Sequence, residues 1–226
     1  YQGSRIDAQQ LFFQTVFRVM GMLAKADGRI SEEEIANTEQ MMTRFGLTPE
    51  SRKTAILFFK QGAAPDFDLE AQIALYLRQG NRGQNAALLL ELLIGIALAD
   101  GELHAEEQVI LSKVAHYLGV PAGQFQQLLD MLKAQAGFAG ANGQSSGFDS
   151  NGGYTDSSRL SEAYKAIGVS EGCSDADLKK AYRKLMSQHH PDKLMAKGVP
   201  EDMIKMATAK SQEIQNAYDL IKRSRK

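Results

Sequence analysis

Residues 174–193 read SDADLKKAYRKLMSQHHPDK, and this stretch sets an amphipathic helix against an abrupt turn. Ser174 can cap the first turn, with Asp177 three residues on, and apolar side chains then recur from Leu178 at three- and four-residue spacing. The opposite face carries a basic stripe formed by Lys179, Lys180, Arg183 and Lys184. Pro191 cannot continue a helix and pushes the preceding residue out of the α region, so the chain must turn at His190.

Helices are predicted on both sides of this stretch. Residues 160–167 form a short apolar face that Gly168 ends as a C-cap, and residues 201–223 repeat apolar side chains at helical spacing. The last of these helices can pack back against the helix that follows Ser174. We therefore expect an antiparallel hairpin with residues 190–192 at its exposed tip.

Residues 189–192 could form a metal site, an acid/base pair or a docking surface. The neighbouring residues distinguish these three possibilities. His189 and His190 are adjacent, so they cannot share a helix face, and no further His or Cys stands nearby at the spacing of a metal site. An acid/base pair is disfavoured because the flanking sequence predicts no pocket. A proline-locked loop that displays an imidazole and a carboxylate beside a cationic helix suits docking on an acidic protein surface. We expect His189 to end the helix and His190 to act in recognition.

Two segments of the C-terminal part resemble a known family. They are LKKAYRKLMSQHHPDK at 178–193 and SQEIQNAYDLI at 211–221, which are similar to the J domain of DnaJ-type co-chaperones over residues 159–223. The resemblance implies binding to a DnaK-type heat-shock ATPase and stimulation of its ATP hydrolysis. It assigns the signalling tripeptide to His190, Pro191 and Asp192, and the docking face to Tyr182, Arg183, Lys184, Lys179 and Lys193. Because no Walker-type phosphate loop is present, we expect an activator of a partner ATPase rather than an enzyme, with no cofactor.

A low-complexity stretch precedes this region. Residues 137–158 read GFAGANGQSSGFDSNGGYTDSS and have almost nothing to bury. Such a composition predicts a flexible tether with an r.m.s. reach of roughly 25 Å. It separates two expected domains, residues 5–136 and 159–226, and the lack of alternating β-branched runs predicts that both are all-α. Residues 1–4 begin with Tyr rather than Met and include Gly3-Ser4, so we expect them to be a cloning remnant.

The first domain contains an internal repeat. AKADGRISEEE at 24–34 returns as ALADGELHAEE at 97–107, and each copy follows an apolar helix. Ser31 or His104 can cap the next helix, with Glu34 or Glu107 as the reciprocal partner of a capping box. This pair of acidic repeats in an all-helical region resembles the TerB-like domain over residues 7–135. The resemblance implies a compact helical bundle without enzymatic activity, whose acidic face is a candidate for binding a metal or a partner.

The repeats also raise the question of a cation site. Each copy has the Gly, apolar and final Glu positions of a calcium-binding loop, but the first and third positions hold apolar residues or Lys25, and a hard cation needs 6–8 oxygen ligands. A local calcium loop is therefore disfavoured. Carboxylates gathered from both copies into one site remain an alternative, and they are Asp27, Glu33, Glu34, Asp100, Glu106 and Glu107. Such a site would make the chain a metal- or stress-sensing adaptor.

The charge balance bears on possible partners. The chain has 26 Lys and Arg against 27 Asp and Glu, but the C-terminal domain is net basic and the rest is net acidic. Nucleic-acid binding is disfavoured because the overall charge is negative and the basic stripe holds only Tyr182 as an aromatic. The lone Cys173 excludes an internal disulfide. No stretch approaches 18 consecutive apolar residues, so we expect no membrane-spanning helix in this chain.

The order of the parts departs from DnaJ itself, in which the J domain comes first and zinc modules follow. Generic client binding is therefore not expected, and the client stays unknown. A TerB-like domain, a Gly-rich tether and a terminal J domain together resemble a family of bacterial DnaJ-like proteins. That resemblance implies a membrane tether in the full-length protein, with this part on the cytoplasmic side of the inner membrane. The TerB-like domain would then supply client, partner or location specificity.

Overall fold

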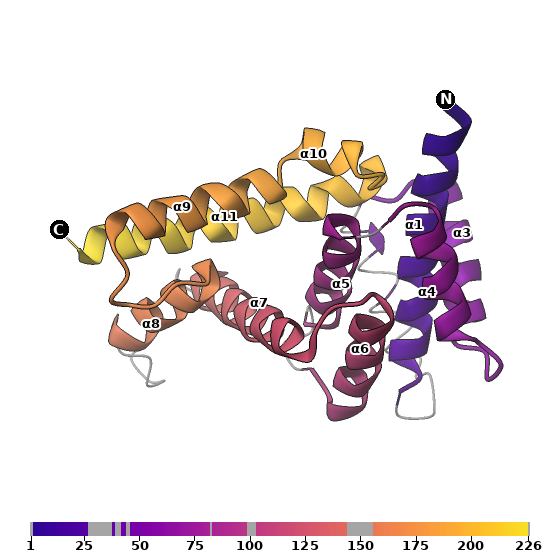
Figure 1. Ribbon diagram of the computed structural model, residues 1–226, viewed down its shortest axis with the longest axis horizontal. Coiled ribbons are helices and arrows are strands. Elements are labelled where there is room, and N and C mark those ends of the chain that lie inside the picture. The colour runs from indigo at the N-terminus through magenta and orange to yellow at the C-terminus, as the bar shows by residue number, and fades with distance from the viewer. Residues whose placement is uncertain are drawn as a thin grey trace.

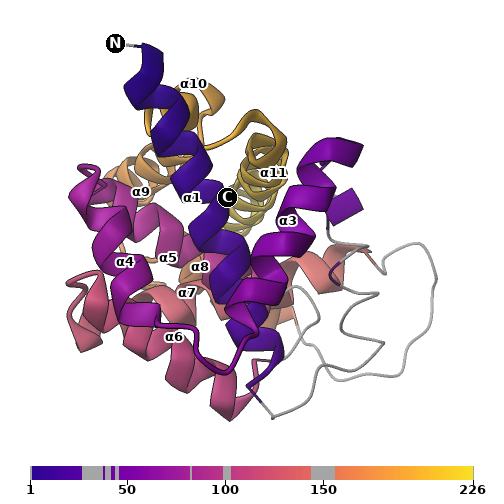
Figure 2. The same cartoon turned by 90° about the vertical axis from the view of Figure 1, so that its right-hand side faces the viewer.

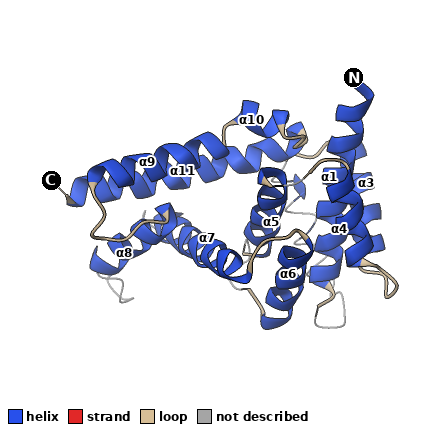
Figure 3. Cartoon of the chain, in the orientation of Figure 1, coloured by secondary structure: helices blue, strands red, loops and turns tan. Residues whose placement is uncertain are grey.

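The described part of the chain is mostly helical (Figure 3), as the sequence predicts. The computed structural model describes residues 2–26, 38, 42–43, 46–81, 83–98, 103–143 and 156–225, and no strand occurs among them. The fold class is therefore all-α. The helices are α1 (Gln2–Ala24), α3 (Pro49–Gly62), α4 (Leu69–Arg78), α5 (Gln84–Ala97), α6 (Ala105–Tyr117), α7 (Ala122–Gly143), α8 (Asp156–Ile167), α9 (Asp175–Gln188), α10 (Pro191–Ala196) and α11 (Glu201–Ser224).

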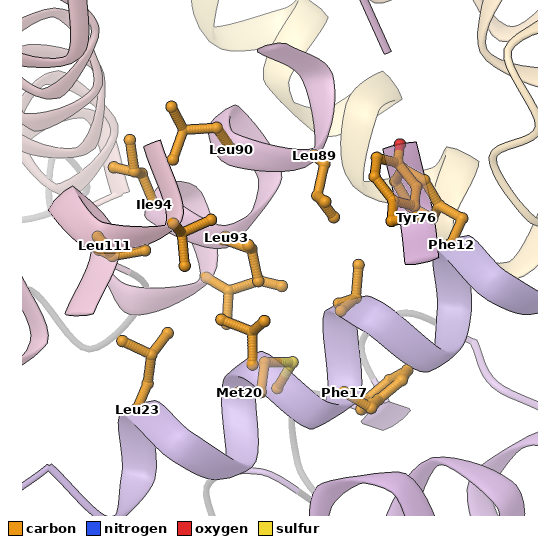
Figure 4. Packing of buried hydrophobic residues seen from close by; sticks show 14 of the residues in the cluster. Phe12, Phe17, Met20, Leu23, Tyr76, Leu89, Leu90, Leu93, Ile94 and Leu111 are labelled. Carbon is orange, nitrogen blue, oxygen red and sulfur yellow. The ribbon is translucent and has the colours of Figure 1, made fainter. Parts of the chain in front are cut away.

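Helices α1 and α3 to α7 form one unit, which we call the N-terminal bundle. Helix α1 packs along α3 and also contacts α4, α5 and α6. Side chains of α1, α5 and α6 meet in the core, among them Leu23, Leu93 and Leu111 (Figure 4). Leu93 and Leu111 are fully buried, and α5 is apolar on most of its surface because its neighbours surround it.

Two glycines let α1 and α3 approach each other closely. A Cβ atom added at Gly21 would lie 1.9 Å from the carbonyl oxygen of Phe59, and one added at Gly62 would lie 1.7 Å from the carbonyl oxygen of Arg18. Any larger residue would place a side chain inside the neighbouring backbone. The contact between these helices therefore depends on glycine at both positions.

Side-chain caps fix where several helices begin. Thr48 accepts a hydrogen bond from the N–H of Ser51 at the start of α3, and Asp68 accepts one from the N–H of Ala71 at the start of α4. Each cap satisfies a backbone donor that has no partner within the helix.

Helices α8 to α11 form the C-terminal domain. Helices α9 and α11 run antiparallel, as the sequence predicts, and α8 packs across them (Figure 1). Tyr164 and Ile167 of α8, Leu178 and Leu185 of α9 and Ile214 of α11 lie in one buried cluster. The short helix α10 was not predicted, because six residues are too few to produce a periodic apolar pattern.

The connection between the two parts is helical at both ends. Helix α7 continues to Gly143 and α8 begins at Asp156, while residues 144–155 lie outside the described residues. The domain limits at 136 and 159 and the flexible tether between them stay predictions.

The C-terminal domain packs against the N-terminal bundle at two places. Helix α8 lies on α7, and the segment from α10 to the start of α11 lies beside α1 and α5 (Figures 1 and 2). The second contact puts the turn after α9 close to the N-terminal bundle.

Candidate functional site

The helix that carries the predicted docking face begins at Ser174. The hydroxyl of Ser174 accepts a hydrogen bond from the N–H of Asp177 at 3.1 Å, which is the predicted cap of α9. Leu178 and Leu185 then point into the core of the C-terminal domain, and both are less than 10% exposed. Burying this face fixes the rotation of α9 and leaves the basic face to solvent.

The tripeptide follows directly from the end of α9. His190 has φ −66° and ψ 129°, the extended backbone expected of a residue before proline, and Pro191 occupies the first turn of α10. The carbonyl of His190 accepts hydrogen bonds from the N–H groups of Lys193 and Leu194 at 3.0 and 3.1 Å. The turn is therefore held by backbone hydrogen bonds as well as by the proline ring.

The polar groups of the tripeptide point to solvent. The Nδ1 atom of His190 accepts a hydrogen bond from the N–H of Asp192 at 3.2 Å, and the Asp192 carboxylate lies 3.8 Å from the same nitrogen. In a neutral imidazole the ring proton then sits on Nε2, which can donate to a partner. The side chains of His190 and Asp192 are 56% and 80% exposed. The tip therefore presents the Nε2–H donor of His190 and the carboxylate of Asp192 side by side.

The basic face of α9 is open to solvent. Lys179, Lys180, Arg183 and Lys184 are exposed along it, and so is Lys193 at the start of α10. The Nζ of Lys193 donates to the hydroxyl of Ser187, which holds this cation close to the end of α9. The predicted tripeptide and these cations are therefore open to solvent together, and Lys193 links the tip to the end of α9.

Tyr182 is placed differently from the other predicted docking residues. Its ring stacks on Tyr218 with centroids 4.1 Å apart and an interplanar angle of 19°, and its hydroxyl donates to Oε1 of Gln215. Burial raises the pKa of Tyr182, and the negative charge of Asp219 adds to this shift. Tyr182 therefore ties α9 to α11 and is less exposed than the cations around it.

Arg225, which was not predicted from the sequence, closes the far end of the hairpin. Its guanidinium donates to the hydroxyl of Tyr164 at 2.8 Å, to the carboxylate of Asp175 at 2.6 Å and to the carbonyl of Cys173 at 3.0 Å. These hydrogen bonds raise the pKa of Arg225. One side chain thus joins the end of α11 to α8 and to the start of α9, and no local pattern in the sequence signals it.

His189 also differs from expectation. It ends α9, as predicted, but its side chain is only 3% exposed and its Nε2 lies 3.2 Å from Oε1 of Glu91 on α5. The two histidines therefore have separate roles, because His190 faces solvent while His189 faces the N-terminal bundle.

The acidic repeat is described only in part. In the second copy the N–H of His104 donates to Oε2 of Glu107 at 3.0 Å, which is the predicted capping contact at the start of α6. Glu106 is exposed. The remaining members of the predicted carboxylate set lie outside the described residues, and they are Asp27, Glu33, Glu34 and Asp100. Within the described part of the chain, His, Cys, Asp and Glu side chains do not gather in groups of three or more that could hold a metal ion.

Among the described helices, none is both long enough and apolar enough to cross a membrane.

Comparisons with known proteins agree with this architecture. The family model for the tellurite resistance protein TerB matches residues 14–130, and the model for the DnaJ domain matches residues 162–226. The co-chaperone protein DjlA of Vibrio vulnificus (strain YJ016) is 42% identical over 232 residues, covering 98% of this chain and 81% of the relative. DjlA of Yersinia pestis is 42% identical over 224 residues, covering 96% of this chain and 80% of the relative. DjlA of Shewanella oneidensis is 39% identical over 225 residues, covering 99% and 81%.

No solved structure matches the chain. The order of a TerB domain followed by a DnaJ domain, together with identities of this size over nearly the whole chain, identifies the family. The chain belongs to the family of the co-chaperone protein DjlA.

Proposed function

We propose that this chain docks a DnaK-type heat-shock ATPase through its C-terminal domain and stimulates ATP hydrolysis by that partner. The observation that supports the proposal most is the tip formed by His190, Pro191 and Asp192. The side chains of His190 and Asp192 are exposed while the backbone of the tip is held by hydrogen bonds, and the exposed basic face of α9 directly precedes the tip in the chain.

The mechanism has a steering step and a signalling step. The cations of α9 attract an acidic surface on the ATPase and raise the rate of encounter, an effect that added salt weakens. In the docked complex, Nε2–H of His190 donates a hydrogen bond and the carboxylate of Asp192 accepts one. Stimulation requires that these contacts differ between two conformations of the ATPase, because a ligand shifts an equilibrium only by its differential affinity. The bond-breaking chemistry takes place in the nucleotide site of the partner.

Steady-state ATP turnover by a DnaK-type ATPase tests the proposal. The unsubstituted chain should raise turnover, and His190→Gln and Asp192→Asn should abolish this increase without loss of folding. His116→Gln is the matched control, since His116 is an exposed histidine on α6, far from the tip in sequence and in the fold. Equal stimulation by the unsubstituted chain and by His190→Gln would sink the proposal.

The N-terminal bundle is assigned a targeting role in this proposal, in which it binds a client or a partner or sets the location of the protein. In the full-length protein we place this part of the chain on the cytoplasmic side of the bacterial inner membrane. Cell fractionation of the full-length protein tests the location, and recovery of all of it without the membrane would contradict it.

The alternative of a metal- or stress-sensing adaptor stays a prediction that rests on the acidic repeats. Calorimetric titration of the chain with Ca²⁺, Zn²⁺ and Mn²⁺ separates the two. Heat that disappears when Asp27 and Asp100 are both replaced by Asn would favour the sensor, and no heat with any of these metals would remove it.

A further inference from the structure

Three apolar side chains that follow the tripeptide belong to the core of the other domain. Leu194 in α10, Val199 in the next turn and Ile204 in α11 are 1%, 4% and 9% exposed. They lie in the hydrophobic cluster of the N-terminal bundle, whereas Leu185 and Ile214 of the same hairpin lie in the cluster of the C-terminal domain. The hairpin is therefore buried against two different cores.

Further contacts with the N-terminal bundle lie around Leu194, Val199 and Ile204. His189 is buried with its Nε2 3.2 Å from the carboxylate of Glu91, which projects from α5. Burial lowers the pKa of the half-buried Lys197, while the charge of Glu91 acts in the opposite direction. On the side of α1, a Cβ atom added at Gly198 would lie 3.7 Å from the Cβ of Ala8. The segment 189–204 thus touches both α1 and α5.

A second contact holds the opposite end of the C-terminal domain. Gln135 of α7 is 2% exposed and its Nε2 donates to the carbonyl of Ala166 in α8 at 2.7 Å. Met131 of α7 packs against the hydrophobic clusters of both domains. One contact alone would leave a hinge, but two contacts at separate ends fix the orientation of the domain.

Docking leaves the predicted recognition surface free. His190, Asp192 and the cations of α9 stay exposed while His189, just before the tripeptide, and Leu194, two residues after it, are buried. A hollow of about 440 Å³ lies where the domains meet, lined by Asp192, Met195, Ala196 and Glu201 from one side and by Gln9 of α1 from the other. A partner that covers Asp192 therefore meets α1 at the same time.

We propose that the N-terminal bundle is the docking platform of its own C-terminal domain. Residues 189–204 are the docking element, and the two domains meet the ATPase as one body whose composite surface includes Asp192 and Gln9. The composite surface for the ATPase rests on the function proposed above, whereas the docking of residues 189–204 on the N-terminal bundle does not.

An engineered disulfide tests the docking directly. The substitutions Ala8→Cys and Gly198→Cys, in a chain with Cys173→Ser, place two Cβ atoms at a separation within the range of about 3.5–4.5 Å that disulfides adopt. Mild oxidation should close the disulfide within one chain, read as a mobility shift without reductant. Adding Val199→Asp to undock the segment should slow closure by roughly tenfold, whereas Val109→Asp, which replaces a valine 53% exposed on α6, should not.

Gly198 has a φ of +82°, so cysteine there is strained, and a second measurement avoids that position. Carbodiimide coupling of the unsubstituted chain should join Lys197 to Glu91, identified by peptide mass. Failure of both cross-links would overturn the docking.

ATPase turnover tests the composite surface. The oxidised, cross-linked chain should stimulate to the same extent as its reduced form, and Gln9→Glu should weaken stimulation at low chain concentration. Loss of stimulation on oxidation, or no effect of Gln9→Glu, would overturn the composite surface. If the unsubstituted chain fails to stimulate, the proposed function fails, while the cross-links still decide the docking.

Discussion

Gly21→Ala tests the packing of the N-terminal bundle most sharply. An added Cβ would stand 1.9 Å from the carbonyl oxygen of Phe59, 2.8 Å from its carbonyl carbon and 2.9 Å from the nitrogen of Ala63, whereas ordinary contacts of a Cβ begin at 3.4 Å. The obstructing atoms are backbone, so no side chain can turn aside. Helix α3 must therefore move away from α1 by more than an ångström.

The magnitude follows from two opposing contributions. Alanine is favoured over glycine in a helix interior by about 1 kcal/mol. Overpacking typically costs about 1–3 kcal/mol and more where backbone must shift, so we take about 3–5 kcal/mol for this clash. The net loss in the free energy of unfolding is then about 2–4 kcal/mol, and at about 3 °C per kcal/mol it lowers Tm by about 6–12 °C.

Thermal unfolding followed by far-UV circular dichroism measures this change, with Gly137→Ala as the matched control. Gly137 also lies within a helix, α7, but nothing stands within 4 Å of its added Cβ. That substitution should stabilise the chain by about 0.5–1 kcal/mol. A Tm for Gly21→Ala at or above that of the unsubstituted chain would refute the reasoning, as would an equal loss in the control.

Three further predictions concern single buried side chains. Tyr76→Phe should reduce the loss of stability in alkali, because burial raises the pKa of Tyr76. The unfolded chain then releases this proton near pH 10 while the folded chain keeps it, so the free energy of unfolding falls above about pH 10, as urea denaturation at several pH values would show. Gln135→Ala removes the donor to the buried carbonyl of Ala166 and should cost about 1–3 kcal/mol in the same assay. Leu178→Ala, at a site 2% exposed, should cost about 2–5 kcal/mol. Leu57→Ala is the control for Leu178→Ala. Because Leu57 is 55% exposed, its substitution should change the free energy of unfolding by no more than about 0.5 kcal/mol.

Local rules were sufficient to predict the hairpin of the C-terminal domain. A cap at Ser174, apolar spacing from Leu178 and the proline at 191 each act within a few residues, so their effects can be read from the chain alone. The same holds for the second acidic repeat, where Glu107 binds the N–H of His104 as the capping pattern predicts. These features set the direction of α9 and therefore the place of His190.

Contacts between distant segments escaped prediction. The environment of His189 depends on Glu91, which lies almost a hundred residues earlier in the chain. Leu194 is buried in the hydrophobic cluster of the N-terminal bundle, which is another domain. Arg225 reaches Tyr164 on α8, Asp175 on α9 and Cys173 in the turn between them, and no spacing rule relates these partners. The Gly- and Ser-rich composition of residues 137–158 shows that this segment has little apolar surface to bury. It does not show whether the two domains on either side of it contact each other.

The energetics of the interface between the domains indicate how tightly they can hold each other. Burial of side chains such as Leu194 and Val199 contributes at most about 1.5–3 kcal/mol each, so the two together contribute about 3–6 kcal/mol. Taken alone, that range corresponds to dissociation constants from about 6 mM down to about 0.04 mM. A covalent connection gives an effective concentration of about a millimolar. The docked state is therefore favoured within one chain towards the stronger end of that range, although separate domains would associate weakly. An interface of this strength can be displaced by a ligand of ordinary affinity. A ligand that binds the N-terminal bundle where Leu194 and Val199 pack would therefore compete directly with the segment that follows the tripeptide.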